Sequence, residues 1–133
     1  VDTGVPHAVV PVRNVDEVDV QRIGRGLRFH PEFAPRGANI DFIEQSGPNR
    51  LKVRTYERGV EGETLGCGTG VAASAVIHAV TGNGHSKAAR RIQVQTRSGE
   101  TLTVSLRVDG DAVTDVVMEG QAKRICEGTW QPS

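Results

Sequence analysis

The fold of this 133-residue chain is decided by one stretch, Thr55-Tyr-Glu-Arg-Gly-Val-Glu-Gly-Glu-Thr-Leu-Gly-Cys-Gly-Thr-Gly-Val-Ala-Ala-Ser-Ala-Val-Ile-His-Ala79. Its first part ends a predicted strand at Tyr56 and continues into a charged turn. Its second part starts at Gly66 and enters a block, residues 71–80, of mostly small and apolar side chains. A helix that is apolar on every side is typically buried. The stretch therefore predicts a central helix, Gly68–Val80, around which the rest of the chain packs.

Cys67 lies at the first turn of this predicted helix, between two glycines. The first N–H groups of a helix lack acceptors within it, and the helix dipole is positive at that end. A thiol in such a place loses its proton more readily, and the thiolate is the reactive form. The N–H groups of Gly68, Thr69 and Gly70 are also suited to holding a carboxylate or a phosphate. The motif therefore predicts an anion-binding turn with a reactive thiol at its edge.

Cys67 also has a structural alternative, because a lone cysteine beside an apolar helix is usually a small buried hydrophobic residue. The flanking glycines and the charged residues that precede them favour the reactive role. The motif lacks the Gly-Lys-Ser/Thr of a Walker loop, and no second cysteine is near enough for a Cys-x-x-Cys site. Cys126, the other cysteine, lies in a predicted strand with no helix start after it, so we expect a structural role for it.

Composition argues against several functional classes. With 16 basic and 16 acidic residues, the chain offers no electrostatic basis for binding nucleic acid or a membrane surface. No apolar run is long enough to cross a membrane and no signal-peptide pattern is present, so we expect a soluble protein. Two cysteines do not form a disulfide framework, which favours a reducing cytoplasm. His30, His78 and His85 show no ligand spacing, so no metal site is predicted.

Periodicity and turn signals predict the other elements. One further helix is expected over Asn14–His30, with Asp16 as its N-cap. Strands are expected over Val1–Val12, Ala38–Glu44, Leu51–Tyr56, Arg91–Thr96, Thr101–Val108, Ala112–Met118 and Lys123–Glu127. Turns are expected at Thr3–Pro6, Ser46–Asn49, Thr81–Gly84, Arg97–Glu100 and Asp109–Asp111.

The predicted fold class follows from this order of elements. The length suits a single domain over residues 1–133 with a core of its own. In Ala38–Glu44, Ile40 and Phe42 fall on one face, as in a half-buried strand. We predict an α+β fold, in which a curved, mostly antiparallel sheet wraps around the central helix and the earlier helix lies outside.

Four more polar residues lie where predicted elements begin or end, which is where site residues usually project. They are His7, Asn39, Glu57 and Arg58. Three of them have structural alternatives. His7 is equally well explained as a satisfied, partly buried histidine, and Asn39 as a turn residue. Arg58 is suited to a surface ion pair with Glu61 or Glu63, worth about 0–1 kcal/mol.

Three motifs in this chain carry a resemblance to a known family. They are Thr3-Gly-Val-Pro-His-Ala-Val9, Gly37-Ala-Asn-Ile-Asp-Phe42 and Tyr56-Glu-Arg-Gly-Val-Glu-Gly-Glu-Thr-Leu-Gly-Cys-Gly-Thr-Gly70. Together they resemble the C-terminal half of diaminopimelate epimerase, over nearly the whole chain, and the third motif is highly specific. The resemblance implies an epimerase that needs no cofactor and interconverts LL- and meso-diaminopimelate, on the route to lysine and peptidoglycan.

The resemblance also implies roles for individual residues near the reacting carbon. The family's catalytic cysteine in this half corresponds to Cys67. Its assisting histidine and glutamate correspond to His7 and Glu57. Its contacts to the substrate α-carboxylate correspond to the backbone of Gly68 and Thr69.

At the far end of the substrate, the family's contacts correspond to Asn39 and Arg58. Many members also have an asparagine immediately before Pro-His that touches the substrate, whereas this chain has Val5 there. Specificity for the distal end of diaminopimelate is therefore an open point, and a relative that epimerises another amino acid stays an alternative.

The family's second cysteine lies on a matching N-terminal half, and this sequence has no such motif. We therefore expect a fragment, or one subunit of a split enzyme, that is inactive alone and has an N-terminal half as its partner. A homodimer stays open. The family's last strand returns to the N-terminal half, so the segment 123–133 is expected to pack there.

Two other functional classes stay open from the residues themselves. One is a cysteine hydrolase or transferase, with Cys67 as the nucleophile and His7 as its base. The other is a non-catalytic binding domain of the same fold, because a fold does not by itself imply activity.

Overall fold

The computed structural model describes residues 1–82, 88–110 and 112–132. Three parts of the sequence predictions lie outside these residues. They are the end of the predicted turn Thr81–Gly84, His85, and the last residue of the predicted turn Asp109–Asp111. Along the described chain the elements are β1 (His7–Pro11), η1 (Val15–Glu17), α1 (Val20–Arg28), η2 (Pro31–Phe33), β2 (Asn39–Gly47), β3 (Arg50–Glu57), β4 (Gly62–Thr64), α2 (Gly68–Thr81), β5 (Ala88–Gln95), β6 (Thr101–Asp109) and β7 (Ala112–Glu119). The two η elements are short 3₁₀ helices.

Within the described residues, seven strands form one mixed sheet in the order β1-β2-β3-β5-β6-β7, with β4 also paired to β3. The β1/β2 and β3/β5 pairs are parallel, whereas the other four pairs are antiparallel. One edge of β3 has two partners, because its first residues pair with β5 and its last residues pair with β4. The C-terminal end of β3 is thereby joined to the segment that leads into α2.

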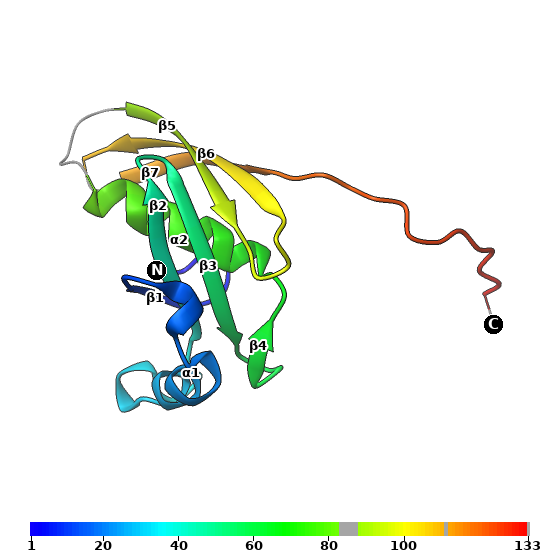
Figure 1. Cartoon of the computed structure of the whole chain (residues 1–133), viewed down its shortest axis with the longest axis horizontal. Helices are drawn as coiled ribbons and strands as arrows, with labels where there is room; N and C mark the ends of the chain where they lie inside the picture. The colour runs from blue at the N-terminus through cyan, green and yellow to red at the C-terminus, as the bar shows by residue number, and fades with distance from the viewer. Residues whose placement is uncertain (83–87, 111, 133) are drawn as a thin grey trace.

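The sheet curls around α2 as a half-barrel (Figure 1). Away from the first turn of α2, the strand residues that face this helix are apolar, because alternate residues of a strand point to the same face. Val71, Ala75 and Ala79 of α2 pack against them. The residues that the sheet contributes are Ile43, Leu51, Val53, Ile92, Val94, Val104, Leu106 and Val108. This arrangement confirms the predicted α+β fold with a central helix.

The apolar sequence of the central helix predicted that it is enclosed on every side, but the structure leaves one side of it partly uncovered. Ala72, Val76 and Val80 are only partly buried. They border an apolar hollow between the N-terminal residues and β7. The reason is that the sheet closes only part of the way around α2, which leaves one stripe of the helix uncovered.

A second apolar cluster lies on the other face of β2 and β3, under α1 and η1. Ile40 and Phe42 share this face, as predicted, and Tyr56 joins them there. Gly24 of α1 lies against Tyr56, and a Cβ at this position would come 2.5 Å from the Tyr56 Cβ. The glycine that weakens the helix in isolation therefore allows α1 to approach the sheet closely. The first half of β2 is buried on both faces as a result.

The predicted helix Asn14–His30 is shorter than expected, and Asp16 is not its N-cap. Asn14 caps η1 by accepting a hydrogen bond from the Asp16 N–H (3.1 Å). Asp19 caps α1 by accepting from the Arg22 N–H (3.0 Å). Each of these side chains caps the start of a separate helical segment, so the chain forms two short helices in place of one. The break allows Val15 and Val20, which are both buried, to reach the same cluster.

The predicted strand Lys123–Glu127 is wrong. Residues 120–132, called the C-terminal tail below, have no helix or strand assigned and extend away from the sheet (Figure 1). A strand is stable only when its N–H and C=O groups find a neighbouring strand, and the tail has none beside it. Three residues in the predicted charged turn, by contrast, form the unpredicted strand β4, because β3 offers them a free edge.

No helix of the described chain is long and apolar enough to span a membrane.

Candidate active site

The topology brings the predicted site residues to one end of the sheet. His7 is the first residue of β1, and it is paired with Asn39, the first residue of the parallel strand β2. Glu57 is the last residue of β3, which runs antiparallel to β2. Cys67 directly precedes α2, which packs against the same strands. Four segments that are distant in sequence therefore converge at this end.

Cys67 is the N-cap residue of α2 and has extended backbone angles (φ −129°, ψ 111°). The first hydrogen bond inside the helix runs from the Val71 N–H to the Cys67 carbonyl (2.9 Å). The N–H groups of residues 68–70 therefore have no acceptor within the helix. The Cys67 side chain is partly exposed, and Gly68 and Thr69 are exposed. The N–H groups of this helix N-terminus are accordingly available to an anionic ligand, and anion binding there stays a prediction.

The segment before Cys67 is fixed by two anchors. Arg54 of β3 donates to both carboxylate oxygens of Glu63 in β4 (2.6 and 2.8 Å). These hydrogen bonds raise the pKa of the Arg54 guanidinium. Further along, the Ser98 N–H in the β5–β6 turn donates to the Leu65 carbonyl (2.9 Å). The segment that leads to Cys67 is therefore held by hydrogen bonds to β3 and to the β5–β6 turn.

His7 is buried and fully engaged. Its Nδ1 lies 2.7 Å from Oδ2 of Asp41, and its Nε2 lies 2.9 Å from Oγ1 of Thr69. The same Thr69 oxygen lies 3.4 Å from Sγ of Cys67. Thr55 donates to the other oxygen of Asp41 (2.7 Å). The structure thus links His7 to Cys67 through one hydroxyl group. His7 is a satisfied, buried histidine, as the structural alternative described, and its role in a site stays a prediction.

Asp41 was missed by sequence reasoning. In the pattern Ile40-Asp41-Phe42 a carboxylate between two apolar residues suggests the exposed face of a strand, yet Asp41 has no exposed surface. It faces the first turn of α2, where a Cβ on Gly70 would overlap Oδ1 of Asp41. The signal available from the sequence was the glycine at residue 70, which permits this close approach.

Asn39 and Arg58 are joined to each other. Asn39 is buried, and its Oδ1 accepts a hydrogen bond from the Arg58 backbone N–H (2.7 Å). Its Nδ2 donates to the Pro6 carbonyl (3.4 Å). The Arg58 guanidinium donates to the Arg36 carbonyl (3.4 Å). Much of the Asn39 amide is therefore used in holding the chain at the entrance to β1.

The surface ion pair considered for Arg58 does not form. Glu61 accepts a hydrogen bond from Arg28 (3.1 Å), and Glu63 is paired with Arg54. The Gly59 N–H is the main cause that lowers the pKa of Glu61, and the Arg28 hydrogen bond adds to it. Glu57, in contrast, makes no side-chain hydrogen bond to any described residue, including His7 and Cys67. It is partly exposed at the same end of the sheet.

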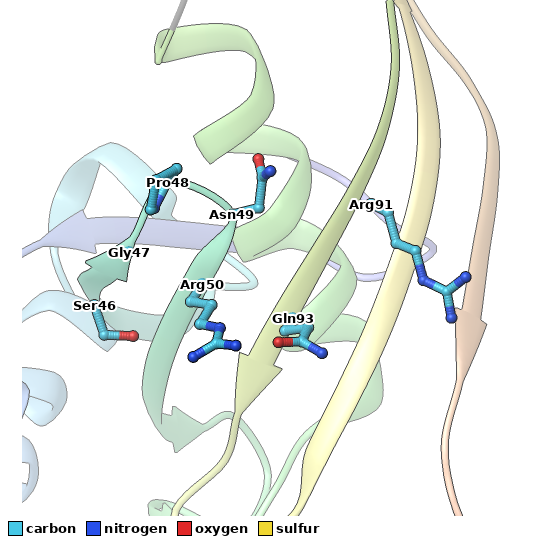
Figure 2. Close-up of a pocket in the computed structure, with 7 residues that line it drawn as sticks. All are labelled: Ser46, Gly47, Pro48, Asn49, Arg50, Arg91 and Gln93. Atoms are coloured by element: carbon cyan, nitrogen blue, oxygen red, sulfur yellow. The ribbon is translucent and has the colours of Figure 1, made fainter.

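A second hollow, of about 600 Å³, lies at the opposite end of the β2–β3 hairpin (Figure 2). Arg50, Arg91 and Gln93 line it together with the turn between the two strands. Because β2 begins at the Cys67 end and finishes at this hollow, none of the predicted site residues takes part in it. Among the described residues, no group of three or more His, Cys, Asp and Glu side chains is arranged to hold a metal ion.

Comparisons with known proteins agree on one family. The family model described as diaminopimelate epimerase matches residues 1–125. Diaminopimelate epimerase of Aquifex aeolicus is 44% identical over 128 residues, which are 96% of this chain and 44% of the relative. That of Chlorobaculum tepidum is 41% identical over 129 residues, 97% of this chain and 48% of the relative. That of Methanocella arvoryzae is 42% identical over 96% of this chain and 42% of the relative. The chain thus spans less than half the length of these relatives.

Proposed function

The chain belongs to the diaminopimelate epimerase family, and we propose that it forms one half of a cofactor-independent amino-acid epimerase, an isomerase. The observation that carries this proposal is the position of Cys67 at the N-terminus of α2, linked through Thr69 to the buried His7. The substrate that we propose is diaminopimelate, in the synthesis of lysine and peptidoglycan precursors, and the compartment is the cytoplasm.

The stereochemistry of the reaction requires two groups. Inverting one carbon means that one base removes the α-proton from one face while an acid returns a proton to the opposite face. We assign Cys67 to one of these faces, as thiolate or thiol according to the direction of turnover. The second thiol belongs, in this proposal, to a complementary N-terminal half. Glu57 and His7 control which cysteine is ionised, since both lie at the same end of the sheet.

The α-carboxylate of the substrate is assigned to the N-terminus of α2. Removal of the α-proton spreads negative charge into this carboxylate. The N–H groups of Gly68 and Thr69, together with the helix dipole, would stabilise that charge. The absence of an acceptor for these groups inside the helix supports the assignment. The chemistry needs no cofactor because these local fields, with exclusion of water, act on the reacting carbon directly.

The distal end of the substrate is assigned to Arg58 and Asn39. An arginine can bind a carboxylate with two parallel hydrogen bonds. The hydrogen bond from the Arg58 backbone N–H to Asn39 supports separate roles for the two residues, in which Asn39 orients the backbone and the Arg58 guanidinium binds the substrate. Val5, where many family members have a substrate-contacting asparagine, gives this end of the site one polar contact fewer.

The proposed partner half would also receive the C-terminal tail. Ile125 and Trp130 are 92% and 83% exposed in the described structure. Large apolar side chains at such exposure are typical of a segment that packs on another surface. We propose that the tail pairs with the N-terminal half as an added strand, which would supply the backbone partners it lacks here.

One observation favours a second candidate function, a cysteine hydrolase or transferase. A base held by a carboxylate and linked to a thiol is also the arrangement of a cysteine nucleophile, and His7 is held by Asp41 in this way. A nucleophile would form a covalent acyl-enzyme, whereas an epimerase does not. Repeated release of p-nitrophenolate from a p-nitrophenyl ester separates the two, since a hydrolase or transferase turns the ester over, whereas the thiol of an epimerase is acylated at most once.

The test of the proposal uses two polypeptides. One is this chain, and the other is the N-terminal part of the Aquifex aeolicus relative that the chain does not match. Each is incubated with LL-diaminopimelate in heavy water, alone and together, and both α-deuterium incorporation and conversion to the meso form are measured. We expect neither from the chain alone and both from the mixture, with Cys67→Ala in the chain as the matched negative control. Inversion by the chain alone, or inversion by the mixture that survives Cys67→Ala, would contradict the proposal.

A further inference from the structure

We propose that the Thr69 hydroxyl relays a proton between Cys67 and His7, and that Asp41 is the positioning residue that sets the direction of this relay. The inference rests on the proposed function and adds two residues to it. Its evidence is a continuous series of hydrogen-bonded atoms: Asp41 Oδ2, His7 Nδ1, His7 Nε2, Thr69 Oγ1 and Cys67 Sγ, joined at 2.7, 2.9 and 3.4 Å.

The partners fix which atom donates at each step. Asp41 presents two oxygens, one to the Thr55 hydroxyl and the other to Nδ1 of His7. A carboxylate only accepts hydrogen bonds, so Nδ1 of His7 carries a proton. In the neutral imidazole, Nε2 is then an acceptor, and it takes the hydrogen bond of the Thr69 hydroxyl. The lone pairs of that hydroxyl remain available for the S–H of Cys67. All donors therefore point from Cys67 towards Asp41.

The transfer balances within these groups. Cys67 passes its proton to Oγ1 of Thr69 while Thr69 passes its own proton to Nε2 of His7. The S–H, O–H and Nε2 lone pair become a thiolate, an O–H that now donates to the thiolate, and an imidazolium that donates to Oγ1. The new positive charge lies against the Asp41 carboxylate, and the new negative charge lies at the N-terminus of α2. The reverse movement restores the thiol.

The surroundings of Asp41 fit a positioning role. It has no exposed surface, and burying a charge without partners is costly, so its place is retained by what it binds. Its partners are a hydroxyl, an imidazole and the first turn of α2, where Gly70 leaves space for the carboxylate. Asp41 does not contact the thiol, so its effect reaches Cys67 only through His7 and Thr69.

The test measures the reactivity of Cys67 in this chain, without turnover. Cys126→Ser leaves Cys67 as the only thiol, because the chain has two cysteines. The rate of alkylation by iodoacetamide is then measured at one fixed near-neutral pH. We expect Thr69→Val to slow it about ten- to a hundredfold, the equivalent of one hydrogen bond to a charged group. Thr69→Ser, which keeps the hydroxyl, should stay within about threefold of the parent on the same reasoning.

Thr81→Val is the matched control for Thr69→Val. Thr81 also lies on α2, but its hydroxyl donates to the Ile77 carbonyl far along the helix from Cys67. It should leave the alkylation rate unchanged. Because Thr69 is exposed, its replacement removes little packing, and thermal unfolding verifies that each variant folds.

The role of Asp41 has its own spectroscopic readout. In nitrogen-15 NMR of the chain, with His7→Gln used to assign the signals, His7 should be the tautomer protonated at Nδ1. Asp41→Asn should change this tautomer population and slow alkylation of Cys67, whereas a merely structural Asp41 would change unfolding alone. Where Asp41→Asn does not fold, the parent tautomer and the Thr69 pair decide the matter.

The outcomes separate the relay from the proposed function. Unchanged alkylation in Thr69→Val, or a His7 protonated at Nε2 alone, would overturn the relay even if the two-polypeptide mixture epimerises its substrate. A slowed Thr69→Val rescued by Thr69→Ser would support the relay even if the mixture shows no inversion, in which case the proposed function would be the part that fails.

Discussion

Two segments of this chain contain the same chemical groups in opposite settings. The segment over residues 54–69 contains a cysteine and an arginine–glutamate pair, Arg54–Glu63. The C-terminal tail contains Cys126 and the pair Arg124–Glu127. In the first segment the Arg54 and Glu63 side chains are 11% and 23% exposed, whereas those of the tail pair are 81% and 82% exposed.

The number of partners differs as much as the exposure. Arg54 binds Glu63 with two nitrogens and also donates to the Val15 and Val18 carbonyls (2.9 and 3.1 Å). Arg124 reaches Glu127, three residues further along the tail, with one nitrogen (3.1 Å). Exposed pairs of this kind contribute about 0–1 kcal/mol, since solvent and salt screen them. The comparison teaches that the neighbours supplied by the sheet, rather than residue type, give these groups a role.

Replacing Cys67 should produce the largest effect in this comparison. In the two-polypeptide mixture, Cys67→Ala removes the group that we propose as one acid/base, so we expect inversion to fall by about 10²–10⁴-fold, the usual contribution of such a group. Chiral analysis of the products measures it. Cys126→Ala, the same change in the tail, should leave the rate intact. Near-normal turnover in Cys67→Ala would show that the setting of this thiol does not matter to the reaction.

Gly70→Ala should cause the largest loss of stability. The added Cβ would overlap the Asp41 carboxylate, which is itself held by His7 and Thr55. We expect the free energy of unfolding to fall by about 1–3 kcal/mol, as in other overpacked interiors. Chemical denaturation measures this change. Gly128→Ala in the tail is the matched control, because no atom lies within 4 Å of a Cβ there. Equal effects at the two positions would contradict the comparison.

Arg54→Lys and Arg124→Lys test the two ion pairs directly. Lysine keeps the charge but cannot reproduce the fork of hydrogen bonds that Arg54 makes. We expect Arg54→Lys to lower the free energy of unfolding by about 1–2 kcal/mol, the loss of one or two hydrogen bonds. Arg124→Lys should stay within about 0.5 kcal/mol of the parent, as surface changes usually do. An unchanged free energy of unfolding in Arg54→Lys would show that the Arg54–Glu63 pair does not fix the segment before Cys67.

Acid should lower the free energy of unfolding through Glu61, which directly precedes β4 in the segment that contains Cys67. Hydrogen bonds from Gly59 and Arg28 hold the pKa of Glu61 below its ordinary value of 4.5. Glu61 therefore stabilises the fold above that pH, and the contribution is lost as the pH falls through the lower, folded value. Because Glu61 is partly exposed, we expect less than about 1 kcal/mol. Urea unfolding at several pH values should show a smaller acid loss in Glu61→Gln, while Glu127→Gln behaves like the parent.

Cys126→Ala should have the smallest effect. A well-buried cysteine would lose about 1–3 kcal/mol on truncation, but Cys126 is exposed in the tail. In this chain we therefore expect a change within about 0.5 kcal/mol. Thermal unfolding of the single variant checks it. If the tail packs on an N-terminal half as we propose, the same variant should become measurably destabilising only in the two-polypeptide mixture.

The sequence predicted the elements whose pattern is local. The apolar block after Gly70 predicted the central helix, and the alternation at Ile40 and Phe42 predicted β2 and its face. The glycine-flanked Cys67 predicted a thiol at a helix N-terminus. The sequence could not predict that the helix Asn14–His30 divides at Asp19, because that break depends on where Val15 and Val20 pack against the sheet.

By itself, then, the sequence determined the α+β class, the central helix and the identity of the residues at one end of the sheet. Only the tertiary structure decided that Asp41 is buried beneath α2, that His7 reaches Cys67 through Thr69, and that Lys123–Glu127 is not a strand. The physical reason is that burial and strand pairing depend on neighbours distant in sequence. Side-chain alternation places Asp41 on one face of β2, but only α2 packed across that face turns it into a buried partner of His7.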